Sequence, residues 1–152
     1  MKSYARLVLL AACAVALLTT FAAADTPGAH PAYLHALSDL RYARAHLGQP
    51  VSSRRADADE QLAIEEIDAA IHEVKEAAID DGKNLDDHPG VDPGWGRGDR
   101  LRRALDLLDH AHKEIDEREQ DSYAKGLKKR ALHHIDEARK AVRHAIKAER
   151  HE

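Results

Sequence analysis

The chain of 152 residues repeats itself at an offset of 68 residues, the separation of Ala36 from Ala104. The offset holds without a gap across two separate segments, which favours a duplicated unit over chance matches between Ala-rich helices. Such self-similarity is typical of a supersecondary unit that cannot bury its apolar face alone, and two copies can cover each other. The matching pairs are Ala36/Ala104, Leu37/Leu105, Leu40/Leu108, Ala43/Ala111, Ile67/Ile135, Asp68/Asp136, Ala70/Ala138, Val74/Val142 and Ala77/Ala145.

The first 24 residues have the pattern of a secretory signal peptide. Lys2 and Arg6 give a positively charged start, and an apolar run occupies residues 7–18. Ala22 to Ala24 form an A-x-A cleavage site. The run is shorter than the roughly 20 apolar residues that a membrane-spanning helix needs. We therefore expect residues 1–24 to be a signal peptide that is cleaved after Ala24, and the mature protein to be periplasmic or secreted.

A second interpretation of the same segment is a bacterial lipoprotein. Residues 10–13, Leu-Ala-Ala-Cys, resemble a lipoprotein cleavage box that would place a lipid on Cys13. The apolar run before Cys13 is short and continues past it to Leu18, which favours ordinary secretion. Lipidation at Cys13 remains the alternative.

Composition excludes several function classes for residues 25–152. Cys13 is the only cysteine, so cleavage after Ala24 leaves neither a disulfide nor a thiol ligand. Removing Lys2 and Arg6 takes the formal net charge from −4 to −6. An acidic chain is a poor partner for nucleic acid or for an anionic membrane. We therefore expect no nucleic acid and no membrane span, and we leave open an unknown protein partner.

Helix signals divide the mature chain into four segments. Pro31 suits the first turn of a helix and Gly48 suits the end of one. Asp57 and Asp99 have the character of N-caps for the second and third helices, and the fourth begins near Ser122. The predicted single domain spans residues 25–152, with one hairpin at 31–82, a linker at 83–98 and a second hairpin at 99–150.

Apolar residues recur at alternating spacings of three and four in the predicted helices, and the opposite faces carry dense charge. In the third helix the expected stripe is Leu101, Leu105, Leu108 and Ile115. Narrow stripes are typical of helices packed in a bundle with a slight supercoil. The predicted fold is therefore all-α, an up-down-up-down four-helix bundle built from two duplicated αα-hairpins that a pseudo-twofold axis relates.

Eleven histidines make a secreted bundle a candidate for binding copper, nickel or zinc. A helical chelate needs two ligands three or four residues apart, and no two histidines have either spacing. Histidine does meet a carboxylate at a spacing of four, but chance gives nearly as many such pairs, which favours ordinary salt links on solvated faces. The pairs are His35/Asp39, Asp68/His72, His72/Glu76, Asp106/His110, His110/Glu114, His112/Asp116 and His133/Glu137.

His112 falls on the apolar stripe of the third predicted helix, and its repeat equivalent is Arg44. Both side chains can extend along the edge of the bundle and keep their charge in water, which is the simpler interpretation. The alternative is a polar site inside the bundle, with Asp109, Asp116 or Glu73 as neighbours. The candidate metal ligands from the sequence are His112, Asp109, Asp116, His110, Asp106, His72 and Asp68.

The sequence contains no motif typical of a catalytic site. It lacks a G-x-S-x-G motif, a Gly-rich phosphate loop, H-E-x-x-H and the Glu-x-x-His of di-iron bundles. We therefore predict a protein that is not an enzyme, with two competing functions. The first is an interaction or stress-protection module that uses the charged faces or the bundle groove. The second is periplasmic binding of a divalent transition metal, the one cofactor considered, through scattered His and carboxylate groups.

Two stretches, HPAYLHALSDLR at residues 30–41 and the segment 79–89, resemble a group of secreted bacterial helical-bundle proteins of unknown function. This resemblance covers most of the mature chain and implies a helical bundle with no particular activity. Residues 110–112 (HAH) and 133–138 (HHIDEA) are also similar to periplasmic small metal-binding proteins, which are His-rich helical hairpins. That second resemblance implies metal binding.

Overall fold

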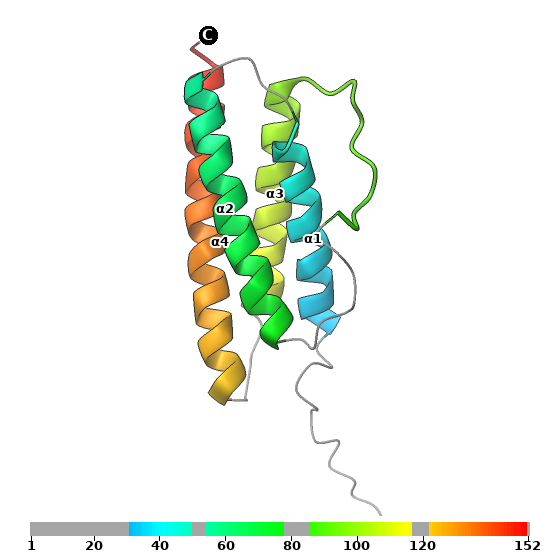
Figure 1. The fold of residues 1–152 in the computed structure, drawn as a ribbon, viewed down its shortest axis with the longest axis vertical. Helices are drawn as coiled ribbons and strands as arrows, with labels where there is room; N and C mark the ends of the chain where they lie inside the picture. Colours follow the sequence, from blue (N-terminus) through cyan, green and yellow to red (C-terminus); the bar gives the residue numbers. More distant parts are fainter. Residues whose placement is uncertain (1–30, 50–53, 78–85, 117–121, 152) are drawn as a thin grey trace, which may run out of the picture.

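The structure is a computed structural model that describes residues 31–49, 54–77, 86–116 and 122–151. These segments form four α-helices and contain no strand, which confirms the all-helical prediction (Figure 1). The helices are α1 (Pro31–Leu47), α2 (Arg54–Ala77), α3 (Arg97–Ile115) and α4 (Ser122–Glu149). The predicted signal peptide at residues 1–24, including Cys13, lies outside the described residues.

α1 and α4 begin where the sequence predicts, whereas α2 and α3 begin earlier. α2 starts at Arg54, ahead of the expected cap Asp57. The N-cap of α3 is Gly96, which offers no side-chain hydrogen bond. The predicted N-cap Asp99 is therefore wrong, because its amide already donates to the carbonyl of Gly96 over 3.1 Å and the residue lies in the first helical turn.

The four helices form a bundle in which each helix contacts two others. α2 packs most extensively on α4 and α1 on α3, and further contacts join α1 to α2 and α3 to α4. α1 and α4 run in one direction, and α2 and α3 run in the other (Figure 1). Every contacting pair is therefore antiparallel, while α2 and α3 are parallel and lie diagonally across the bundle.

This order corrects the predicted up-down-up-down arrangement, because the helices run up, down, down, up. Side-chain pairs between α1 and α3 follow the same register: His35 meets Glu114 at 3.5 Å, and Asp39 meets His110 at 2.5 Å. Four residues forward on α1 thus correspond to four residues back on α3. In an up-down-up-down bundle, α3 would begin at the end of the bundle where α2 finishes. Instead, residues 86–96 run along the side of the bundle to the opposite end, where α3 begins (Figure 1).

Residues 86–96, which we call the strap, lie against α1. The ring of His88 stacks on Tyr42 with 6.3 Å between centroids, and Trp95 stacks on His46 with 5.4 Å between centroids. The later strap residue meets the later α1 residue, so the strap and α1 run in the same direction. The strap thereby allows α3 to begin at the same end of the bundle as α2.

The core alternates alanine with larger aliphatic residues along each helix, in a repeat of seven residues. This repeat keeps one stripe of each helix facing the interior of the bundle, and the small alanine side chains allow neighbouring helices to approach closely. Leu107 is buried, whereas Leu105 on the predicted stripe is only partly buried. None of the four helices combines the length and the apolar character that a membrane crossing needs. The alternating residues are Ala36, Leu40, Ala43 and Leu47; Ala63, Ile67, Ala70, Val74 and Ala77; Leu101, Ala104, Leu108, Ala111 and Ile115; and Ala131, Ile135, Ala138, Val142 and Ala145.

Candidate metal centre

The seven ligands predicted from the sequence do not meet at one point. His72 faces Glu76 on its own helix at 3.3 Å, and Asp106 lies on the exposed surface near Trp95. Of the seven, His110 alone belongs to a group of three ligand-bearing residues within the described segments. Three of the predicted acids are held by cations: Asp68 by Arg44 at 2.6 Å, Asp109 by Arg139 at 2.5 Å and Asp116 by Lys128 at 3.5 Å.

His112 lies at the edge of the α3–α4 hairpin. Its Nε2 atom is 3.5 Å from Oδ1 of Asp136 on α4, and its side chain is partly exposed. The partner is thus none of the three acids expected around it. Arg44 and Asp68 form the equivalent pair in the first hairpin, at residue numbers lower by 68. This contact agrees with the simpler interpretation of His112, a basic group that extends along the bundle edge.

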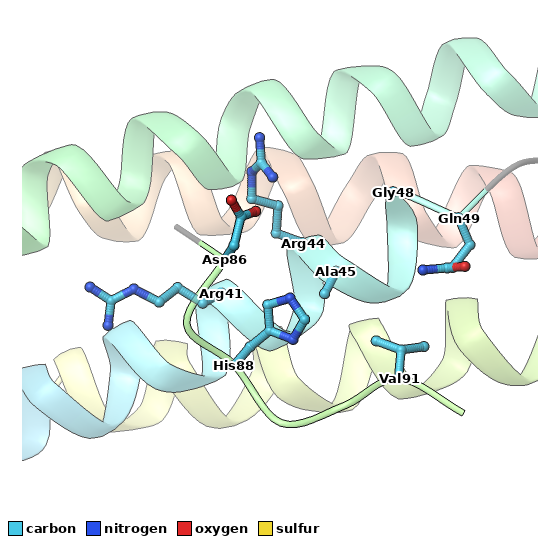
Figure 2. Close-up of a pocket in the computed structure, with 8 residues that line it drawn as sticks. All are labelled: Arg41, Arg44, Ala45, Gly48, Gln49, Asp86, His88 and Val91. Carbon is cyan, nitrogen blue, oxygen red and sulfur yellow. The ribbon is translucent and has the colours of Figure 1, made fainter. Parts of the chain in front are cut away.

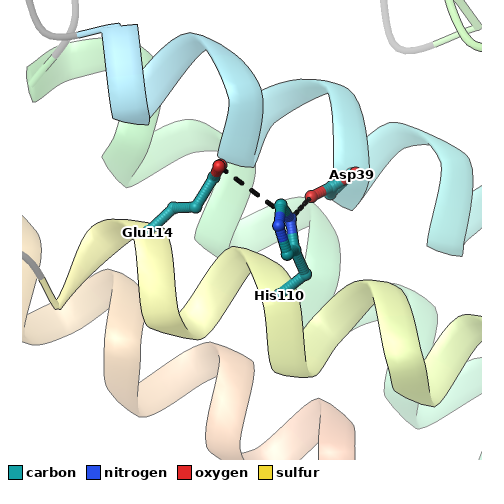
Figure 3. A group of neighbouring side chains, drawn as sticks. All are labelled: Asp39, His110 and Glu114. Carbon is teal, nitrogen blue, oxygen red and sulfur yellow. Dashed lines mark hydrogen bonds and ion pairs between the residues drawn. The ribbon is translucent and has the colours of Figure 1, made fainter.

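Asp39, His110 and Glu114 bring one nitrogen and two oxygen ligands together between α1 and α3 (Figure 3). Nδ1 of His110 lies 2.5 Å from Oδ2 of Asp39 and 3.9 Å from Oε1 of Glu114. One ligand atom from each residue falls within 4.8 Å of the other two. Across the described segments, this is the one His, Cys, Asp or Glu group that meets this criterion.

The helix seam positions these three side chains. Asp39 precedes the buried Leu40 on α1, and His110 precedes the buried Ala111 on α3. Each ligand therefore lies at the edge of a buried stripe. Glu114 follows His110 by one helical turn and points to the same side. Because α1 and α3 are antiparallel neighbours, the two edges face each other.

His35 extends this group toward a fourth ligand. It lies one turn before Asp39 on α1, and its Nδ1 atom is 3.5 Å from Oε1 of Glu114. Its side chain is 71% exposed, so the ring is free to change rotamer. The four residues together offer two imidazoles and two carboxylates.

The carboxylates of the cluster are more buried than its imidazoles. The side chains of Asp39 and Glu114 are 21% and 17% exposed, against 59% for His110. The hydrogen bond to Asp39 raises the pKa of His110, and the negative charges of Asp39 and Glu114 act in the same direction. Oε2 of Glu114 is buried and accepts no hydrogen bond from any described residue. The cluster thus contains an acceptor oxygen that a cation could use.

The same atoms support two chemical states. With His110 protonated, the imidazolium offsets one of the two carboxylate charges between α1 and α3. With His110 neutral, the group is a nitrogen and oxygen donor set of the kind that zinc, copper and nickel accept. A proton and a metal ion therefore compete for the site.

A cavity of about 310 Å³ lies between α1 and the strap (Figure 2). Its polar lining includes Arg41, Arg44, Asp86 and His88. Arg44 is engaged by Asp68 on α2, and Asp86 offsets part of the remaining positive charge. The cavity does not bring together a set of metal ligands, so we assign the candidate centre to the cluster of Figure 3.

Sequence reasoning does not single out Asp39 and Glu114 as ligands. Each does belong to a visible pair with a histidine four residues away, His35/Asp39 and His110/Glu114. Several pairs share this spacing, and only the register of α1 against α3 brings these two together.

No protein-family model matches the chain. No curated protein and no solved structure matches it either. The chemistry of the cluster is therefore the basis on which its function is inferred.

Proposed function

We propose that this protein binds a divalent transition metal, such as zinc, copper or nickel, between α1 and α3. The observation that carries the proposal is the meeting of Asp39, His110 and Glu114, whose ligand atoms lie within 4.8 Å of one another. Imidazole nitrogen with carboxylate oxygen suits these metals, whereas calcium and magnesium prefer oxygen alone. This proposal also agrees with the resemblance to periplasmic His-rich proteins, which rests on sequence alone.

The geometry needs a small adjustment to hold a metal. Bonds of about 2.0–2.2 Å in a tetrahedral site separate neighbouring ligand atoms by roughly 3.3 Å. His110 and Glu114 at 3.9 Å are close to this separation, whereas the 2.5 Å between His110 and Asp39 is a hydrogen bond. A metal would replace the shared proton, and the two side chains would separate by about 1 Å. His35 is the nearest donor for a fourth position.

The pH dependence of binding follows from the raised pKa of His110. The imidazole must lose its proton to become a ligand. Because Asp39 and Glu114 stabilise the protonated form, His110 keeps its proton to higher pH than an ordinary histidine. Metal affinity should therefore increase as the pH rises through this raised pKa, and it should be lost in acid.

The test is titration of the full chain with Zn²⁺, Cu²⁺ and Ni²⁺ at about pH 7.5, followed by calorimetry and thermal unfolding. We expect one ion per chain and a higher melting temperature. His110→Gln and Glu114→Gln should each lose most of this metal-induced increase in melting temperature. His72→Gln is the matched control, because His72 has a carboxylate four residues away but no third ligand among the described residues. No heat with any metal, or an equal loss in His72→Gln, would refute the proposal.

The interaction or stress-protection module is the second hypothesis. Its support is three exposed large apolar side chains, Leu34, Leu62 and Trp95. They lie on α1, on α2 and on the strap, which are separate elements. We therefore place metal binding first. Recovery of a specific protein in pull-downs from periplasmic extract would support the module, as would retention by a variant that no longer binds metal.

We also propose that the two hairpins are copies of one unit that functions outside the cytoplasm, without catalysis. The offset of 68 residues pairs α1 with α3 and α2 with α4, and these are the two most extensive helix contacts. Glu66 and His134, which are equivalent to each other, meet at 2.7 Å. The signal-peptide pattern of residues 1–24 supports the extracytoplasmic location on sequence grounds.

A further inference from the structure

His46 is a buried histidine on α1 with no polar partner among the described residues. Its side chain is fully buried, with 1% of the residue exposed, and neither Nδ1 nor Nε2 makes a hydrogen bond there. The ring contacts two aromatic rings. Tyr42 is 4.5 Å away between centroids, and Trp95 of the strap stacks over it at 5.4 Å. The strap therefore covers a titratable group that has no route to water.

The groups that surround His46 oppose a positive charge on its ring. Arg100 and Arg103 face it from α3, and His88 faces it from the strap. The guanidinium of Arg103 also lies 5.7 Å over the ring of Tyr42, the neighbour of His46 on α1. Burial lowers the pKa of His46 most, and Arg103, Arg100 and His88 lower it further. Among the described residues, the groups that act electrostatically on His46 are all basic.

The strap is the part of this environment that can move most easily. α1 and α3 are held by the bundle core. The strap is held by the stacking of His88 on Tyr42 and of Trp95 on His46, and by an exposed 3.2 Å hydrogen bond from Arg100 to the Trp95 carbonyl. A buried charge without a partner is costly, so a protonated ring needs water. Lifting Trp95 gives it water without disturbing the helices.

We infer that the strap is a pH-sensitive cover, closed while His46 is neutral and opened when its ring takes up a proton. The closed form holds fewer protons than the open form, so acidification favours opening. Opening uncovers the aromatic and arginine surface of Tyr42, His46 and Arg103. This surface lies at the other end of the α1–α3 seam from the metal cluster, and the inference does not depend on metal binding.

Trp95 is the only tryptophan of the chain, so its fluorescence reports on the strap. The experiment titrates the full chain without metal from about pH 8 to about pH 4.5, across the range in which histidine changes charge. It records Trp95 emission, acrylamide quenching and far-ultraviolet circular dichroism. We expect red-shifted emission and stronger quenching, with a midpoint below 6.5, the ordinary value for histidine, while helicity stays constant.

His46→Leu should abolish this transition, because leucine carries no proton and fills the same apolar site. His88→Gln is the matched control in the strap and should retain it. In the parent protein, the imidazole NMR signals of His46 should titrate with the same midpoint as the quenching, which tests the inference even if His46→Leu does not fold. A transition unchanged in His46→Leu, helicity that falls together with the fluorescence, or a His46 signal that titrates without any change at Trp95 would each overturn the inference.

Discussion

Replacing Leu108 by alanine tests how tightly the bundle is packed where the two hairpins meet. Leu108 on α3 and its repeat equivalent Leu40 on α1 are both fully buried, at 0% exposed. The change removes three carbon atoms from a site that solvent does not reach. Leu62→Ala on α2 is the matched control, because it makes the same chemical change at a side chain that is 47% exposed.

The expected cost at Leu108 has two parts. Three buried carbons correspond to about 2.4 kcal/mol of lost transfer free energy at about 0.8 kcal/mol each. If about half of the vacated space stays open, roughly 40 Å³, the cavity adds about 1 kcal/mol. The sum of about 3.4 kcal/mol lowers the melting temperature by about 13 °C for a domain of this size. Leu62→Ala removes only half-exposed surface and should cost about 1 kcal/mol or less.

The measurement is urea and thermal unfolding of both variants in the same buffer, followed by circular dichroism. Equal m-values are required so that a change in midpoint reports a change in stability. A loss at Leu108 no larger than the loss at Leu62 would refute the packing described for the α1–α3 seam.

Two further predictions concern single contacts. Nε of Arg97 donates to Oε1 of Glu60 over 2.7 Å where both side chains are largely buried, so Arg97→Met should cost about 3 kcal/mol by leaving a buried carboxylate without this cation. The double variant Glu60→Leu/Arg97→Met should recover most of that loss in urea unfolding, and a purely additive result would contradict the pairing. A Cβ on Gly126 of α4 would meet Arg130 at an ordinary 3.7 Å, so Gly126→Ala should raise the unfolding free energy by about 0.5–1 kcal/mol. A decrease in thermal stability would contradict a helical backbone conformation at Gly126.

The helices were predictable from sequence because their signals are local. Pro31 and Gly48 bound α1, and the alternating apolar residues identify most of the buried face. The order of the helices was not predictable, because a stripe specifies which face is buried but not which helix covers it. The 19 residues between Ala77 and Arg97 could reach about 60 Å when extended, against about 25 Å for the 17-residue α1. Such a connection permits α2 and α3 to be either parallel or antiparallel.

The candidate site was only partly predictable for the same reason. His110 was among the expected ligands, and its pairing with Glu114 follows from helical spacing alone. Asp39 joins them through the register between two helices, which depends on how alanines and leucines interlock across the seam. His112 was expected at the bundle edge, and it lies there, but its partner Asp136 on the neighbouring helix could not be identified from spacing along α3.

The most extensive contacts of the bundle join each helix to its own counterpart at the offset of 68 residues, α1 to α3 and α2 to α4. Such pairing is the arrangement of an isologous dimer, in which one surface recognises a second copy of itself. A single hairpin therefore carries a self-complementary face, and as a separate chain its assembly would depend on protein concentration. The covalent connection through the strap replaces that dependence with an effective concentration, typically millimolar for short linkers. At low protein concentration the single chain thereby keeps its fold, whereas two separate hairpins would dissociate.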